Sequence, residues 1–239
     1  MILYIAGMFL ILKILTLLKS KTLNWRDAGL YTAGWIGMNP EEFIQEASIP
    51  HKWLPGAVSF LTGTVLLFIS LSQDQGTLRA VYLFTAMLFI FHFGLLDLNA
   101  RLWNFLGRST KPIMNAPWKA LNLADFWGKR WNLAFRDAAH LLLFTPFRKK
   151  MGTKTGLFTV FIFSGIVHET VISVPARGGY GGPMLYFLIQ FSGLLLQKKY
   201  VCLNNRLTTW LILTAPLPLL FHQPFFLNVF IPLSNTIGG

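Results

Sequence analysis

The residues with the clearest capacity for chemistry lie in an apolar stretch around His168. This histidine stands roughly 18 Å into a predicted membrane-spanning helix that begins near Gly156. Ionisable groups at such depth are costly and usually face the protein interior or a wet cavity. Burial favours the neutral imidazole, which can accept a proton from an alcohol, so His168 is a candidate general base. A histidine that hydrogen-bonds a neighbouring helix explains the depth equally well. Ser164 shares the face of His168, whereas Glu169 lies about 100° around the helix.

A second group of polar residues lies in the long basic segment 99–155. We predict that residues 123–147 form one amphipathic helix that ends at Pro146. One stripe of this helix, about 80° wide, holds Asp125, Lys129, Asn132, Arg136 and His140. Arg130 and Asp137 lie beside the stripe, and aromatic residues occupy much of the remaining surface. The stripe could face a cavity, or it could be solvated while the helix lies on anionic headgroups.

The elements that must position these residues are apolar helices. Of the 239 residues, 54% are hydrophobic and 13% are charged, about half the charged share of a soluble domain. We therefore predict an all-α integral membrane protein with a single polytopic domain over residues 1–239. About six transmembrane helices are expected, at 2–18, 54–72, 80–98, 156–174, 183–199 and 207–222. The start lacks a basic n-region and a small-residue cleavage site, which favours a retained span over a signal peptide.

Positive charge sorts to one side of these spans. Segments 19–53, 99–155 and 198–206 hold 18 Lys and Arg residues, against Arg79 and Arg177 on the other side. This asymmetry predicts that the basic loops are cytoplasmic and that both termini lie outside. The net charge of +12 then reflects membrane orientation, and no nucleic-acid partner is predicted. The single cysteine, Cys202, and the absence of a metal-type histidine spacing predict neither an internal disulfide nor a metal site.

Two segments resemble the membrane-bound O-acyltransferase (MBOAT) family, and particularly its wax-synthase-like branch. The first is residues 124–132, with the sequence ADFWGKRWN, and the second is residues 164–169, with the sequence SGIVHE. Their order and the 36-residue separation of Asn132 and His168 are also similar to the family. The sequence WIGM at residues 35–38 is a weaker similarity to the same branch. The resemblance covers roughly residues 30–190.

The resemblance implies an MBOAT-like helical bundle with an internal tunnel, with His168 inside and Asn132 nearby. It also implies that the donor is acyl-CoA, used as a co-substrate from the cytoplasmic side, and that the acceptor is a lipophilic alcohol. No permanently bound cofactor is expected. His168 and Asn132 are then the catalytic candidates, as base and as an amide that positions the donor or stabilises developing charge. The candidates for substrate binding are Asp125, Trp127, Lys129, Arg130, Trp131, Arg136, His140, Ser164 and Glu169.

Two other functions stay open at this point. In a small transporter, the path of a proton or solute would be lined by His168, Glu169, His92 and Asp97. A non-catalytic membrane subunit that holds a partner is the third interpretation. The tryptophan-rich motif on a cytoplasmic segment favours acyl transfer, and so does the lack of the sequence symmetry that many transporters show. The bacterial inner membrane and the endoplasmic reticulum both fit the predicted topology.

Overall fold

The structure is a computed structural model that describes residues 2–20, 23–47 and 52–237. Helices make up most of these residues, and no strand occurs among them, which confirms the prediction of an all-helical protein. The first half contains α1 (Ile2–Lys19), α2 (Trp25–Ala33), α3 (Pro40–Phe43), α4 (Leu54–Leu71), α5 (Thr77–Met87) and α6 (Leu96–Phe105). The middle contains α7 (Leu123–Asp125), α8 (Leu133–Ala139), α9 (Thr145–Met151), α10 (Thr153–His168) and α11 (Val174–Ala176). The C-terminal part contains α12 (Gly182–Lys199), α13 (Arg206–Thr214), α14 (Leu217–Leu220), α15 (Gln223–Phe225) and α16 (Ile231–Ile237).

Several of these helices continue into one another through wider, π-helical turns. Residues Leu88–Leu95 join α5 to α6, so that one long helix runs from Thr77 to Phe105. Residues Glu169–Ser173 join α10 to α11 in the same way, directly after His168. Such turns insert an extra residue into a helical turn and are frequent at functional sites.

Three helices of the described chain are long and apolar enough to cross a membrane: Leu54–Leu71, Thr77–Phe105 and Thr153–Ala176. They coincide with the predicted spans 54–72, 80–98 and 156–174. The predicted span 207–222 corresponds to the helical stretch Arg206–Leu220. This stretch is followed by Gln223–Ile237 after a bend of 58°. If this bent pair of helices counts as a single span, the described chain has up to four candidate spans. The predicted spans 183–199 and 2–18 coincide with α12 and α1 as helices, but neither is among these candidates. The side chains of residues 2–5 lie outside the described part of the chain.

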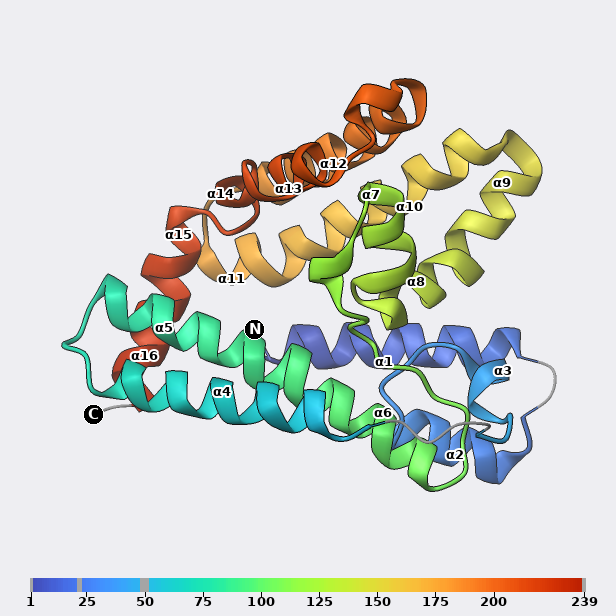
Figure 1. The fold of residues 1–239 in the computed structure, drawn as a ribbon, viewed down its shortest axis with the longest axis horizontal. Helices are drawn as coiled ribbons and strands as arrows, with labels where there is room; N and C mark the ends of the chain where they lie inside the picture. The colour runs from blue at the N-terminus through green and yellow to red at the C-terminus, as the bar shows by residue number, and fades with distance from the viewer. Residues whose placement is uncertain (1, 21–22, 48–51, 238–239) are drawn as a thin grey trace.

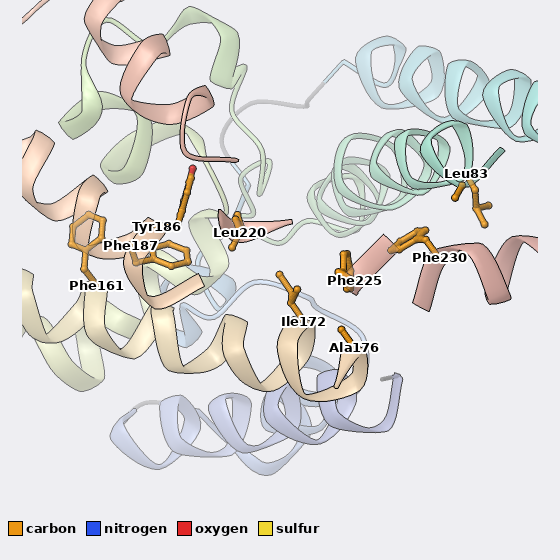
Figure 2. Close-up of a cluster of buried hydrophobic side chains, with 10 residues drawn as sticks. Leu83, Phe161, Ile172, Ala176, Tyr186, Phe187, Leu220, Phe225 and Phe230 are labelled. Atoms are coloured by element: carbon orange, nitrogen blue, oxygen red, sulfur yellow. The ribbon is translucent and has the colours of Figure 1, made fainter. Parts of the chain in front are cut away.

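Apart from α1, the long helices pack in two antiparallel pairs (Figure 1). One pair is formed by α4 against α5 and the turn that follows it, and the other by α10 against α12. A cluster of buried side chains connects α5, α10 and α12 with the C-terminal helices (Figure 2). Phe161 and Phe187 lie at one end of this cluster, whereas Leu83 and Phe230 lie at the other. The helix that carries His168 is therefore held by a core that includes residues of α5 and of the C-terminal helices.

The prediction of one helix over residues 123–147 is wrong, because the chain breaks at Trp131 and Asn132. Asn132 adopts a left-handed backbone with a φ of 41°, and Trp131 is extended. The backbone around the break bonds instead to a segment that precedes it in the chain. The carbonyl of Arg130 accepts from the Asn115 N–H at 2.8 Å, and the Leu133 N–H donates to the Ile113 carbonyl at 2.9 Å. These long-range bonds replace the helical ones that periodicity predicts.

The same prediction placed the end of the helix at Pro146, and this is also wrong. Pro146 lies inside a continuous helical run, because α8, the π-helical turn His140–Phe144 and α9 follow one another without a break, and the helix continues to Met151. Gly152 then ends it with a φ of 88°. Because of the break at Asn132, the predicted polar stripe is divided between α7 with its following turn and α8 with its following turn.

Candidate active site

His168 is the last residue of α10 and is held by its own helix. Its Nδ1 lies 2.7 Å from the carbonyl oxygen of Ser164, one turn earlier. A carbonyl can only accept, so Nδ1 must carry the proton of this hydrogen bond, and Nε2 of the neutral ring keeps its lone pair. Ser164 itself is buried, and its hydroxyl donates to the Val160 carbonyl at 2.9 Å. Ser164 therefore fixes the tautomer of His168 through its backbone rather than through its hydroxyl.

One aromatic ring contacts the imidazole of His168 in the described structure, and two others pack behind that ring. The Phe187 ring, from α12, lies 4.6 Å from it between centroids. Trp127 contacts the same Phe187 ring at 5.8 Å and the Phe161 ring at 6.1 Å. The Nε1 of Trp127 is shielded from solvent and has no hydrogen-bond partner within the described chain. Segment 124–132 is thus connected to His168 through Trp127, which contacts the Phe187 ring that packs on the imidazole.

Glu169 points to the start of α12 rather than to a substrate-sized space. Its Oε1 accepts hydrogen bonds from the N–H groups of Gly181, at 2.9 Å, and Met184, at 3.1 Å. Gly181 is the N-cap of α12 and has no side chain to cap it, so the carboxylate of Glu169 supplies the missing acceptor. The second oxygen, Oε2, is buried without a partner in the described structure.

Asn132 uses one end of its side-chain amide for structure. Its Oδ1 accepts from the Phe135 N–H at 3.1 Å and caps α8. The described chain provides no hydrogen-bond acceptor for Nδ2, so this end of the amide can donate to another molecule. Asparagine is also one of the few residues that tolerate the left-handed backbone required at this break.

Asp125 and Arg130 pair with each other across the turn between them. The Nε of Arg130 lies 2.6 Å from Asp125 Oδ2, which also accepts from the Leu121 N–H at 3.1 Å. Burial alone would raise the pKa of Asp125, but these two hydrogen bonds and the nearby charge of Lys129 lower it below its usual value. The neighbouring Trp131 ring stacks on Phe126 at 5.5 Å. Lys129, in contrast to the paired Arg130, is exposed and is accessible to a soluble anion.

His140 lines a polar cavity, and Arg136 pairs with Asp137, which lines the same cavity. Arg136 pairs with Asp137 at 2.9 Å, and the exposed His140 ring lies 5.1 Å from that of Phe144. Burial and the cations Arg136 and Arg148 lower the pKa of His140. A cavity of about 190 Å³ is lined by Lys19, Ser20, Met38, Asn39, Pro40, Glu41, Asp137, His140 and Leu141. His168 does not line this cavity, so the structure does not gather all the predicted site residues in one place.

Two contributions to the site were missed from the sequence. Phe187 lies 19 residues after His168 in another helix, and nothing in its local sequence distinguishes it from other core aromatics. Asp137 lay outside the predicted stripe, yet it lines the polar cavity because α8 begins anew after the break. Ser173 and His222 form a separate polar contact away from His168, with Ser173 Oγ 3.2 Å from His222 Nε2. His222 Nδ1 accepts from the Phe225 N–H, so Nε2 carries the proton and cannot act as a base toward Ser173.

Comparisons with known proteins find a family match over the segment that contains the predicted site residues. Residues 110–189, which include Asn132 and His168, match the model of the membrane bound O-acyl transferase family. The resemblance to this family and to its wax-synthase-like branch is thereby confirmed. No solved structure matches the chain.

Similar proteins of plants extend the comparison. A probable long-chain-alcohol O-fatty-acyltransferase 7 of Arabidopsis thaliana is 32% identical over 93 residues, which are 35% of this chain and 27% of the plant protein. Probable long-chain-alcohol O-fatty-acyltransferase 8 of the same plant is 36% identical over 81 residues, 30% of this chain and 24% of that protein. The long-chain-alcohol O-fatty-acyltransferase of Simmondsia chinensis is 26% identical over 152 residues, 54% of this chain and 43% of the relative. The match thus covers less than half of each of these relatives.

Proposed function

We propose that this chain is a membrane-embedded O-acyltransferase that moves an acyl group from acyl-CoA to the hydroxyl of a lipophilic alcohol. The observation that carries this proposal is the bond from His168 Nδ1 to the Ser164 carbonyl, because it leaves a basic Nε2 on a helix that can span a membrane. The match to the membrane bound O-acyl transferase family supports the reaction class. The relatives named as long-chain-alcohol O-fatty-acyltransferases support an alcohol acceptor.

In the proposed reaction, His168 Nε2 removes the proton of the acceptor hydroxyl as its oxygen attacks the thioester carbonyl carbon. The new C–O bond forms, and the C–S bond breaks as the tetrahedral intermediate collapses. The imidazolium then returns its proton to the departing thiolate, so that ester and free CoA are the products. No covalent acyl-enzyme is required, and no serine or cysteine lies in a recognisable nucleophile motif.

Asn132 would assist through the end of its amide that the fold leaves available. Its Oδ1 is occupied as the cap of α8, which orients Nδ2 as a donor. A donor held in this way can stabilise negative charge that develops on the thioester oxygen. The exposed Lys129 and the other cations of segment 99–155 would attract the CoA phosphates on the cytoplasmic side.

The proposal includes the arrangement in the membrane. Helices α1 and α12 would complete the six crossings, and the space beside His168 would open into a tunnel that admits the two substrates from different sides. α12 fits this role because it packs along α10 and brings Phe187 to the imidazole. The first turn of α12 is also tied to α10 through Glu169.

The test is release of CoA by the purified full chain, given a panel of acyl-CoA donors and lipophilic alcohols. His168→Ala should lower alcohol-dependent turnover by about 10²- to 10⁴-fold, the usual contribution of a general base. Asn132→Ala should lower it by about 10²- to 10³-fold, the usual contribution of one oxyanion donor. Thr170→Val is the matched control on the same helical segment, because the Thr170 hydroxyl bonds only to the Ile166 carbonyl of its own helix. Full activity in His168→Ala, or no release from folded protein across the panel, would overturn the proposal.

A further inference from the structure

Arg79 is a buried cation that the proposed reaction does not use. It lies in the first turn of α5, and only 4% of its surface is exposed. Its Nε and Nη2 are shielded from solvent and have no hydrogen-bond partner in the described part of the chain. Asp74, the nearest acidic residue in the sequence, is exposed and forms no ion pair with Arg79. A buried guanidinium without a partner is strongly destabilising, so a compensating anion is expected.

The two unpartnered nitrogens define the shape of the missing partner. Nε and Nη2 form one edge of a guanidinium and can hold two oxygens of a single group. The same pair of atoms on Arg101 does so in this protein. Arg101 Nε lies 2.5 Å from Asp97 Oδ2, and its Nη2 lies 3.0 Å from Oδ1. The edge of Arg79 that lacks a partner therefore suits an anion that presents two oxygens, such as a carboxylate or a phosphate.

The backbone at this position also favours an anion. The helix begins after Gly76, which supplies no side-chain cap, and its first turn contains no acidic residue. The free N–H groups and the positive end of the helix dipole are therefore not neutralised, and Arg79 adds a further positive charge to them. The Cα–Cβ bonds of a helix tilt toward its N-terminus, which favours a position of the guanidinium near these N–H groups. An anion bound here would accept hydrogen bonds from the guanidinium and from the free N–H groups of the first turn.

The surroundings place this position at one end of a candidate span, next to the C-terminal helix. Thr77–Phe105 is long and apolar enough to cross a membrane, and Arg79 lies two residues from its start. α16 packs against α5 at the same end of the molecule (Figure 1). Lipid phosphates lie at the level of span ends, so a lipid headgroup is the nearest source of the required anion.

We propose that Arg79 and the first turn of α5 form a binding site for the phosphate of an anionic phospholipid headgroup. Arg79 holds two phosphate oxygens through Nε and Nη2, and the N–H groups of the first turn complete the site. The bound lipid fastens the α4–α5 hairpin against α16. This site is independent of His168 and of the reaction proposed for it.

The test uses the full chain purified in a neutral, lipid-free detergent. Three probes are added separately: dioleoylphosphatidylglycerol, dioleoylglycerol, which lacks the phosphate, and inorganic phosphate. Binding is measured by native mass spectrometry and by the rise in melting temperature. The variants are Arg79→Gln, Arg79→Lys and, as a control, Arg177→Gln, which removes an exposed arginine from the same predicted side.

Phosphatidylglycerol should bind the parent chain and Arg177→Gln equally and should stabilise both. The affinity of phosphatidylglycerol for Arg79→Gln should be lower by about tenfold or more, since hydrogen bonds to a charged group are lost. Arg79→Lys keeps the charge without the two-pronged edge, so its affinity should be intermediate; if Arg79→Gln does not fold, this weaker binding is the test. Equal binding of phosphatidylglycerol to the Arg79 variants and the parent, or equal stabilisation by dioleoylglycerol, overturns the site. Stabilisation by inorganic phosphate alone overturns the assignment to a lipid.

Discussion

Replacing Glu169 tests whether this carboxylate organises the start of α12 next to His168. Glu169→Ala removes the two hydrogen bonds that Oε1 accepts from Gly181 and Met184. These hydrogen bonds join residue 169 to the first turn of α12, three residues before Phe187 contacts the imidazole. The variant should therefore be less stable and should also lose turnover, because the ring beside His168 is held less firmly.

The size of the effect follows from the environment of each bond. Hydrogen bonds to a charged group contribute about 1.5–3 kcal/mol each, which would give at least about 3 kcal/mol for the pair. The Gly181 bond is exposed, so water can replace it. The buried, unpartnered Oε2 is destabilising by about 1–3 kcal/mol, and alanine removes that cost. A net loss of about 1–2 kcal/mol in the free energy of unfolding is expected.

The assay is reversible unfolding of the detergent-solubilised chain, combined with the CoA-release measurement. Glu169→Gln keeps a neutral acceptor, which is roughly half as strong as a charged one. Stability should therefore fall in the order parent, Glu169→Gln, Glu169→Ala, and turnover should follow the same order. Thr170→Val, one residue further along, should change neither quantity. If Glu169→Ala unfolds at the same denaturant concentration as the parent, Glu169 does not hold α12 and the reasoning fails.

Three further predictions concern other parts of the structure. Asn132→Ala should destabilise the chain more than Asn132→Gly, because alanine loses the cap and must also adopt a φ of 41°; denaturant unfolding of both variants measures the difference. Gly165→Leu should lower turnover, since even a Cβ at Gly165 would lie 2.7 Å from Met184 Sδ, whereas Gly128→Ala meets no atom within 4 Å and should fold as the parent does. Burial raises the pKa of Asp137 from 3.8 to about 6, despite the opposing charge of Arg136. The Asp137 carboxyl therefore holds its proton more tightly in the folded state than in the unfolded state. The stability of the fold should be greatest below pH 4 and should fall as the pH rises through 6. This pH dependence of the free energy of unfolding amounts to up to about 3 kcal/mol, and Asp137→Asn should remove it. Denaturant unfolding of both proteins between pH 4 and 8 measures the difference. The same change of stability with pH in the parent and in Asp137→Asn would contradict the prediction.

The sequence predicted best those elements that hydropathy alone determines. A long apolar run with few charges has one favourable arrangement in a bilayer, so the helices that contain residues 54–71, 77–105 and 153–176 were all found, with one end misplaced by seven residues and the others by three or fewer. The placement of His168 within a candidate span followed from the hydropathy of the segment. The tautomer did not, because it depends on a bond of 2.7 Å to the Ser164 carbonyl that only coordinates reveal.

The basic segment was harder to predict because its shape is set by long-range bonds. Periodicity treats residues 123–147 as one helix, and their composition does not contradict this. The break at Asn132 is stabilised by residues 113–115, which lie almost twenty positions earlier and carry no turn motif. Phe187 was missed for a related reason, since its contact with His168 arises from the packing of two helices distant in the chain.

The partners of the buried ionisable groups also bear on the choice between acyl transfer and transport. A proton path needs carboxylates that exchange their partners easily. Asp97 is instead held by both Nε and Nη2 of Arg101, and Glu169 accepts from two backbone N–H groups at the start of α12. Releasing either would leave a buried charge or two helix-terminal donors without a partner. The imidazole of His168 differs, because its single described hydrogen bond uses Nδ1 and leaves Nε2 available. One basic atom, fixed in tautomer on an imidazole that packs against Phe187, suits proton removal from one bound hydroxyl better than relay along a chain of groups.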